Sequence, residues 1–215
     1  MILKRKKIKR NRIKIIIGSI FIIVGLSLII FKYINIYNKE KIEESNINKF
    51  MEVQEEFEKT DNVVTNIEEP KKEEKQEEYI AIIEIPKIYL KKGLYNIHSK
   101  NNVVDKNIQI LQESNLPDVK NGNFILAGHS GNGSTAYFRN LYKLDLGDKV
   151  NIFYNGNQYM YIVTNKYEID KTGEAEIIRD RNTTNLTLIT CSQTNHTKQI
   201  VIVCDLEKSL IMKGW

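Results

Sequence analysis

The sequence lacks several signatures that would assign it to a common functional class. It has no P-loop, no glycine fingerprint of dinucleotide-binding proteins and no internal repeat. Its three histidines do not combine with either of its two cysteines at the spacing of a zinc site. The acidic residues that fit either a solvated loop or a calcium site are Glu168, Asp170, Glu174 and Glu176. We therefore predict no cofactor and assign no metal site.

Acidic residues are absent from the first fourteen positions, which carry eight lysines and arginines. Residues 15–31 then contain no charge, and Lys32, Tyr33 and Tyr37 are suited to extend an apolar span into the membrane interface. A cleaved signal peptide is the alternative, but the run is long for one and no small-residue cleavage site follows it. We predict a basic cytoplasmic tail over 1–14, a single-pass membrane anchor over 15–37, and an extracellular location for everything after residue 38.

The basic character of the chain belongs to this tail. The formal net charge is +5, and because the tail alone contributes more than that, the remainder of the chain is net negative. A nucleic-acid-binding protein would need its basic residues clustered on the folded domain. The sequence therefore predicts that the chain has no nucleic-acid partner.

Residues 38–78 are dominated by Glu, Lys, Gln and Asn and are predicted to form a charged stalk. The first part of the stalk has apolar residues at helical spacing, namely Ile42, Ile47, Phe50, Val53 and Phe57. This pattern predicts an amphipathic helix up to about residue 59, followed by a flexible segment that holds the domain off the membrane.

Residues 79–215 are predicted to form one folded domain of mainly β structure. About 130 residues suffice for a single hydrophobic core. Runs rich in β-branched residues predict strands over 79–85, 90–95, 123–127, 149–154, 158–168, 186–190 and 199–205. The dipeptide Asn155-Gly156 between two of these runs is a strong hairpin signal. Short helices are expected over 107–113 and near 137–141.

Cys191 stands at the end of a predicted strand, where a polar connector to the last predicted strand begins. A strand end fixes the backbone of a reacting group while the adjoining loop leaves room for a substrate. The alternative is that Cys191 is a small buried residue. The second cysteine, Cys204, would lie opposite residues several positions before Cys191 in such a hairpin, so we expect no disulfide and read Cys204 as core packing.

His129 likewise follows a short apolar run, in a loop rich in Gly, Ser and Asn. A free thiol is mostly protonated at neutral pH, and a nearby imidazole can turn it into the attacking thiolate. The pair Cys191 and His129 is thus a candidate catalytic pair. A solvated loop histidine is the alternative, and His196 is a competing base.

Three segments resemble the sortases, the cysteine transpeptidases of Gram-positive cell envelopes. They are TLITC at 187–191, AGHS at 127–130, and YFRNL followed by LxxGD over 137–148, with the histidine about sixty residues before the cysteine. The resemblance covers roughly residues 79–206. It implies a closed eight-stranded β-barrel with short helices, which follows the anchor and stalk along the chain. It also implies that Cys191 cleaves an LPxTG-like sorting signal, holds it as a thioacyl enzyme and passes it to an amine such as a peptidoglycan precursor.

The resemblance carries two further site residues. Thr190, next to the nucleophile, is expected to help position the peptide or the developing oxyanion. Sortases have an arginine on the strand after the cysteine, and in this sequence the residue before the final apolar run is Lys198, followed by Gln199. Lys198 is therefore the candidate for that role, with Arg139, Arg179 and Arg181 as alternatives.

The sequence disfavours two sortase subclasses and is compatible with more than one activity. The short interval between residues 168 and 186 disfavours the helical insertion of class B. The absence of a later apolar span and of an Asp-Pro-aromatic lid motif disfavours class C, so an A-, D- or E-like enzyme is expected. Because lysine replaces the arginine, a catalytically weak or inactive sortase-like domain that binds sorting-signal peptides is the alternative function. An ordinary hydrolytic cysteine peptidase has only the Cys and His in its favour.

Overall fold

The computed structural model describes residues 2–59 and 78–212, and it describes no side chains for residues 2–16 and 54–59. The chain divides into two compact units, Met1–Ser45 and Asn46–Trp215. The described residues of the first unit are helical, and the second contains the end of the same helix and the strands that the structure describes.

Helix α1 spans Ile2–Lys59, so the predicted anchor and the first part of the predicted stalk form one continuous helix. Its segment Ile17–Val53 is long and apolar enough to cross a membrane. The large apolar side chains between Ile17 and Tyr37 are exposed, as suits a helix surrounded by lipid. The flexible segment predicted after residue 59 lies outside the described residues.

Near the end of α1, two of the five apolar residues of the predicted amphipathic stretch are buried, while Ile42 and Val53 are exposed. Ile47 and Phe50 are buried and belong to a small apolar cluster with Tyr79, Ile82 and Phe153. Ile82 and Phe153 are partners on neighbouring strands. The two strands that carry Ile82 and Phe153 therefore bury apolar residues on both faces, one in the main core and the other in this small cluster.

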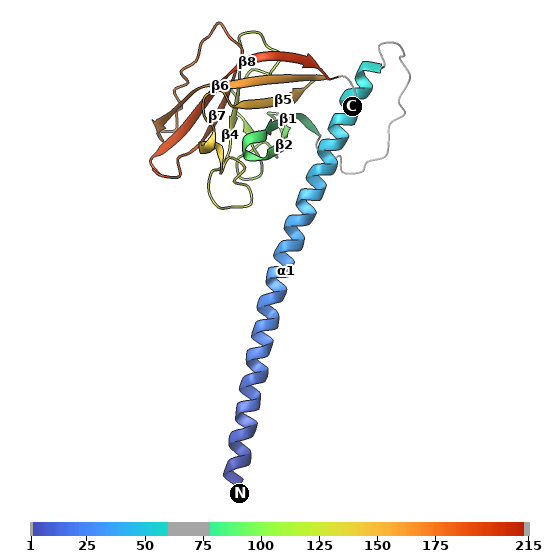
Figure 1. Ribbon diagram of the computed structural model, residues 1–215, viewed down its shortest axis with the longest axis vertical. Coiled ribbons are helices and arrows are strands. Elements are labelled where there is room, and N and C mark those ends of the chain that lie inside the picture. The colour runs from blue at the N-terminus through green and yellow to red at the C-terminus, as the bar shows by residue number, and fades with distance from the viewer. Residues whose placement is uncertain (1, 60–77, 213–215) are drawn as a thin grey trace. The chain divides into compact units, whose positions relative to one another are not determined.

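The second unit is a mainly β domain whose single sheet of eight strands nearly closes into a barrel (Figure 1). The strands are β1 (Tyr79–Ile85), β2 (Leu90–Tyr95), β3 (Gln109–Ile110), β4 (Asn123–Ala127), β5 (Lys149–Tyr154), β6 (Asn157–Asp170), β7 (Asn185–Cys191) and β8 (Lys198–Ile211). Their order in the sheet is β2-β1-β5-β6-β8-β7-β4-β3. All neighbours are antiparallel except β4 and β7. Seven of these strands coincide with the predicted ones, and the mainly β prediction is confirmed.

The helix predicted over 107–113 is wrong, because this segment contains strand β3. Gln109 and Ile110 pair with Ala127 and Leu126 of β4. The reason is the buried Asn102, whose side-chain oxygen accepts a hydrogen bond from the Ile110 N–H at 2.7 Å. Its amide also donates to the Ile110 carbonyl at 2.9 Å, so the side chain satisfies this backbone as a neighbouring strand would.

The seam of the barrel lies between β2 and β3, the two ends of the strand order, which contact each other. The Asn107 side chain donates across it to the Gly93 carbonyl at 2.8 Å. The helix expected near 137–141 lies slightly later, as the 3-10 helix η2 (Leu141–Lys143). The Asn155-Gly156 hairpin is confirmed: both residues have positive φ, 49° and 71°, and they join β5 to β6.

The LxxGD segment, residues 144–148, forms a turn that ion pairs with Lys87 stabilise. Lys87 contacts Asp145 at 2.7 Å and Asp148 at 2.6 Å, and the Asp148 carboxylate also accepts the Asp145 N–H. The hydrogen bond from Lys87 lowers the pKa of Asp145. Gly147 has φ +89°, a conformation that side chains rarely adopt, which explains a glycine there.

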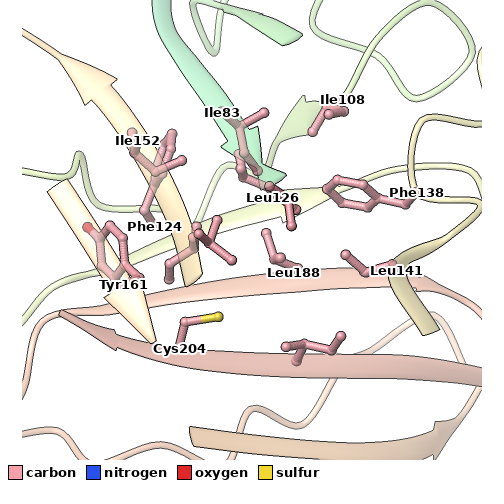
Figure 2. Packing of buried hydrophobic residues seen from close by; sticks show 14 of the residues in the cluster. Ile83, Ile108, Phe124, Leu126, Phe138, Leu141, Ile152, Tyr161, Leu188 and Cys204 are labelled. Atoms are coloured by element: carbon pink, nitrogen blue, oxygen red, sulfur yellow. The ribbon is translucent and has the colours of Figure 1, made fainter. Parts of the chain in front are cut away.

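The main core fills the barrel. In Figure 2 the labelled side chains, among them Phe124, Leu126, Phe138, Leu188 and Cys204, gather in one interior cluster. Tyr161 is fully buried in the same cluster. Among the described residues its hydroxyl has no hydrogen-bond partner, and burial raises its pKa.

We expect Tyr161→Phe to leave the free energy of unfolding unchanged or to raise it by about 1 kcal/mol, because an unsatisfied buried hydroxyl costs roughly 1–3 kcal/mol. Urea unfolding followed by circular dichroism measures the change. The matched control is Tyr154→Phe, the same change at a half-buried position. A marked loss of stability in Tyr161→Phe alone would mean that the hydroxyl has a hydrogen-bond partner.

Candidate active site

Strands β4 and β7 bring the two candidate catalytic residues to the same end of the barrel. The strands are parallel, with Ala127 beside Ile189, and the Gly128 N–H continues the ladder by donating to the Ile189 carbonyl at 3.1 Å. His129 and Cys191 each follow the paired residue of their strand by two positions. Parallel neighbours lie about 4.8 Å apart, and residues in register project from the same face. Continued two residues past its last pair, this register would place His129 and Cys191 side by side on one face.

That face is the outside of the barrel. Leu188 of β7 and Ile200 of β8 belong to the main core, so the alternate residues of these strands face outward. Cys191 has this outward parity and is half-buried, whereas Cys204 is fully buried. Both cysteines are free, and Cys204 pairs with Leu186, five residues before Cys191. The predictions of no disulfide and of a core role for Cys204 are confirmed.

The loops that carry the two residues are joined by side-chain hydrogen bonds. The Thr190 hydroxyl, which is buried, donates to the Gly128 carbonyl at 2.7 Å. The Gln193 amide donates to the Ser130 carbonyl at 2.9 Å and to the Arg139 carbonyl at 2.6 Å. These bonds connect the residues around the cysteine to the residues around the histidine. They fix the relative position of the two backbones.

Gly128 is the small residue that lets the histidine loop pack closely. A Cβ at position 128 would lie 2.8 Å from Cδ2 of Phe138, a core residue. The Phe138 N–H donates to the His129 carbonyl at 3.0 Å, so the chain folds back over this point. The Gly of the AGHS segment thus serves packing.

The His129 imidazole contacts a carboxylate from another loop. Its Nε2 lies 2.9 Å from Oδ1 of Asp105, which belongs to the connection between β2 and β3. The Asp105 side chain is 88% exposed and that of His129 42%. Asp105 did not emerge from the sequence, because nothing in its neighbourhood there signals a contact 24 residues away.

Lys198 and Gln199 lie on opposite faces at the start of β8. Gln199 is the direct partner of Cys191, so the two side chains project from the same face. Lys198 has the parity of Ile200, which faces the core, and its partner on β6 is Asp170. Both residues are half-buried. The sequence singled out Lys198, and only the register identifies Gln199 as the nearer neighbour of the cysteine.

Two of the alternative cations are engaged in structural contacts. Arg139 donates to the carbonyls of Gly131 and Gly133, at 2.9 and 3.0 Å. Arg179 donates to the Asn185 side chain at 2.7 Å. The third alternative, Arg181, is exposed in the loop before β7. The competing base, His196, is exposed in the β7–β8 connection.

No cluster that could hold a metal ion occurs among the described residues. The candidate calcium ligands lie on the last part of β6 and in the loop that follows it. In that part of the chain Glu168 accepts a hydrogen bond from the Ser192 hydroxyl at 2.8 Å, next to the candidate nucleophile. This acid therefore supports the cysteine loop.

Comparison with known proteins defines the family. The family model of the sortase domain matches residues 83–207, more than half of the chain. The chain belongs to the sortase family. It is 26% identical over 205 residues to sortase A of Bacillus anthracis, covering 92% of this chain and 96% of that protein. It is also 38% identical over 89 residues to sortase A of Listeria monocytogenes, covering 41% of this chain and 40% of that protein.

Solved structures agree. The structure of Listeria monocytogenes sortase A matches with a TM-score of 0.53 and 28% identity, covering 63% of this chain and 91% of that chain. The Clostridium perfringens Sortase D5 transpeptidase matches with a TM-score of 0.56, covering 78% of this chain and 99% of that chain, and at 23% identity it supports the fold alone. The predictions of a sortase family member and of a sortase-type barrel are confirmed. The β6–β7 connection contains no helix, which is compatible with an A-, D- or E-like enzyme.

Proposed function

We propose that this protein is a membrane-anchored cysteine transpeptidase that cleaves an LPxTG-like sorting signal and transfers the released acyl group to an amine of the cell envelope. The observation that supports this most strongly is the parallel pairing of β4 and β7, whose last pair, Ala127 and Ile189, lies two residues before His129 and Cys191. A thiol and an imidazole in this relation are the minimum that acyl transfer through a thioester requires. The envelope acceptor is a peptidoglycan precursor or another primary amine.

In the proposed reaction His129 takes the proton of the Cys191 thiol, and the thiolate attacks the carbonyl carbon of the threonine in the signal. The tetrahedral intermediate collapses as the bond between threonine and glycine breaks. His129 gives its proton to the departing amine, which leaves a thioester on Cys191. The acceptor amine then attacks the thioester and loses a proton to His129, and the thiolate departs. His129 then returns its proton to the thiolate, so the products are the transferred amide and the free thiol.

The proposal is tested by incubating the full-length protein in detergent with LPxTG-like peptides and a glycine-peptide amine, and separating the products by mass. A new amide between the threonine and the added amine supports the transpeptidase. Hydrolysis alone in the presence of excess amine would instead indicate a peptidase. Tight peptide binding with no cleavage would favour the non-catalytic peptide-binding alternative, which rests on Lys198 standing where sortases carry an arginine.

The developing oxyanion needs a donor or cation near Cys191, and we propose Lys198 for this role. The register puts Lys198 on the opposite face of β8 from Cys191, so its long side chain would have to reach round the strand end. Its charge acts without strict geometry, although it lacks the planar fork with which an arginine holds two acceptors. We expect Lys198→Ala to lower the acylation rate by roughly tenfold or more and Lys198→Arg to retain or raise it. Pre-steady-state acylation kinetics measure the effect, since peptide binding should change little.

Gln199 is the matched comparison, because it is the direct partner of Cys191 and its amide is a neutral donor. Gln199→Ala is expected to affect acylation less than Lys198→Ala does, if charge is what matters. The reverse ranking, with Lys198→Ala silent, would assign the oxyanion to the Gln199 amide. If both variants were silent, the weak or non-catalytic alternative would gain support.

Thr190 stays a proposed contributor to the site. Its direct contact with a bound peptide or oxyanion is a prediction, while its hydrogen bond to the Gly128 carbonyl supports a second role. Through that bond Thr190 holds the backbone next to His129. Both roles affect the acylation step without being essential to it.

We also propose that α1 anchors the protein with its N-terminus in the cytoplasm and the barrel outside. The basic tail before the apolar segment supports this orientation. Protease added to cells without their wall is expected to degrade the barrel and to spare a tag at the N-terminus. Protection of the barrel together with loss of the tag would reverse the orientation.

A further inference from the structure

We propose that Asp105 is a positioning residue for His129: its carboxylate holds the imidazole in the orientation and tautomer that the cysteine needs. The inference rests on the proposed function, in which His129 exchanges a proton with Cys191. It starts from the 2.9 Å separation between Nε2 of His129 and Oδ1 of Asp105. The Asp105 side chain is 88% exposed.

The chemistry of the contact determines where the proton of the neutral imidazole lies. An ionised carboxylate has only acceptor oxygens, so the hydrogen bond requires that Nε2 carry the hydrogen. Nδ1 is then the unprotonated nitrogen, and it is free to take the proton of the Cys191 thiol. When it does so, both ring nitrogens carry hydrogen, and the imidazolium lies between the thiolate and the Asp105 carboxylate. The positive ring thus has an anionic partner on both sides.

An exposed ion pair usually contributes little, because ordering two side chains offsets most of the attraction. The loop of Asp105 reduces that cost, since its backbone is already fixed on both sides. Asn102, three residues before, is buried and bonded through its side chain to both backbone groups of Ile110. Asn107, two residues after, is buried and donates to the Gly93 carbonyl. Asp105 therefore stands on a short turn whose ends are tied to the barrel.

The loop itself is also closed by local bonds. The N–H groups of Lys106 and Asn107 both donate to the Val103 carbonyl at 2.9 Å, which forms a single turn with Asp105 at its outer side. The carboxylate is thus presented to His129 before any peptide binds. A bound sorting signal that covered the site would remove water from the pair, and the attraction would become stronger.

The test measures the alkylation of Cys191 by iodoacetamide in the full-length protein, at one pH, with peptide mapping to separate Cys191 from the buried Cys204. This reaction depends on the thiolate and needs no sorting signal. The variants are Asp105→Ala, Asp105→Glu, His129→Ala and the double variant of Asp105→Ala with His129→Ala. The control is Asp118→Asn, which removes an exposed carboxylate from another loop. Asp118 lies before the first residue of β4, whereas His129 follows its last residue.

We expect Asp105→Ala to slow the alkylation by about fivefold, the upper end for an exposed pair. Asp105→Glu should recover part of the rate and Asp118→Asn should retain all of it. In the His129→Ala background, Asp105→Ala should have no further effect, because its action passes through the imidazole. For peptide turnover, the same variant should lower kcat while KM changes little.

In the alkylation assay, either of two results would overturn the inference: an unchanged rate in Asp105→Ala, or an equal slowing with and without His129. A rise in KM at constant kcat in Asp105→Ala would also contradict it, since that result would mean that Asp105 contacts the bound peptide. The proposed function fails differently. In that case no peptide is turned over by the unaltered protein, whatever the coupling of Asp105 and His129 in the alkylation reaction.

Discussion

Cys191→Ala is expected to abolish both peptide cleavage and transfer while the barrel stays folded. The reason is that no other thiol can replace it: Cys204 is fully buried in the core, and burial raises the pKa of its thiol. Cys191 is half-buried at the outward-facing end of β7, so its replacement leaves no core cavity. Product formation from an LPxTG-like peptide and an amine measures the loss, and circular dichroism confirms the fold.

The control for this variant is Cys204→Ala. It should retain transfer and lose a modest amount of stability, about 1 kcal/mol, because it removes one buried atom from a packed core. The two cysteines should thus give opposite patterns, with activity lost in one variant and stability lost in the other. Activity that survived Cys191→Ala would mean that the chemistry does not pass through this thiol.

His129→Ala is expected to lower the rate of transfer by roughly 10²- to 10⁴-fold, the usual contribution of a positioned proton donor and acceptor. The parallel pairing of β4 and β7 ends with Ala127 beside Ile189, two residues before His129 and Cys191, and thus favours this histidine as the base. The fold should be unaffected, because the His129 side chain is 42% exposed. Single-turnover acylation measures the effect without interference from product release.

His196→Ala is the matched control, a histidine removed from an exposed loop position five residues after the cysteine. It should leave transfer within about twofold of the unaltered protein, as expected for a surface change away from the reacting groups. If His196→Ala abolished transfer and His129→Ala did not, the base would be His196. The assignment of proton transfer to His129 would then be wrong.

Local sequence patterns were sufficient to predict most of the strands. Alternating or β-branched runs bounded by turn residues predicted seven of the eight, and Asn155-Gly156 predicted the β5–β6 hairpin. The short strand β3 was missed because its two residues owe their conformation to the Asn102 side chain rather than to a run of their own. Such a tertiary contact leaves no periodic trace in the sequence.

The composition of the site was only partly predictable. Cys191 and His129 could be found because each follows an apolar run that ends in a polar loop. That their strands end at the same end of the barrel depends on β4 pairing with β7 across sixty residues of chain, which local patterns do not encode. The same holds for Asp105, brought in by the β2–β3 loop, and for Gln199, whose relation to Cys191 comes from the hairpin register.

The most direct test of the central claim is the intact mass of the full-length protein after brief exposure to an LPxTG-like peptide without added amine. The account predicts an increase equal to the peptide up to its threonine, located on Cys191 by fragmentation. Hydroxylamine should release this adduct, as it does thioesters, and Cys191→Ala should not acquire it. Cleavage of the peptide with no adduct on Cys191, or an adduct on another residue, would contradict it.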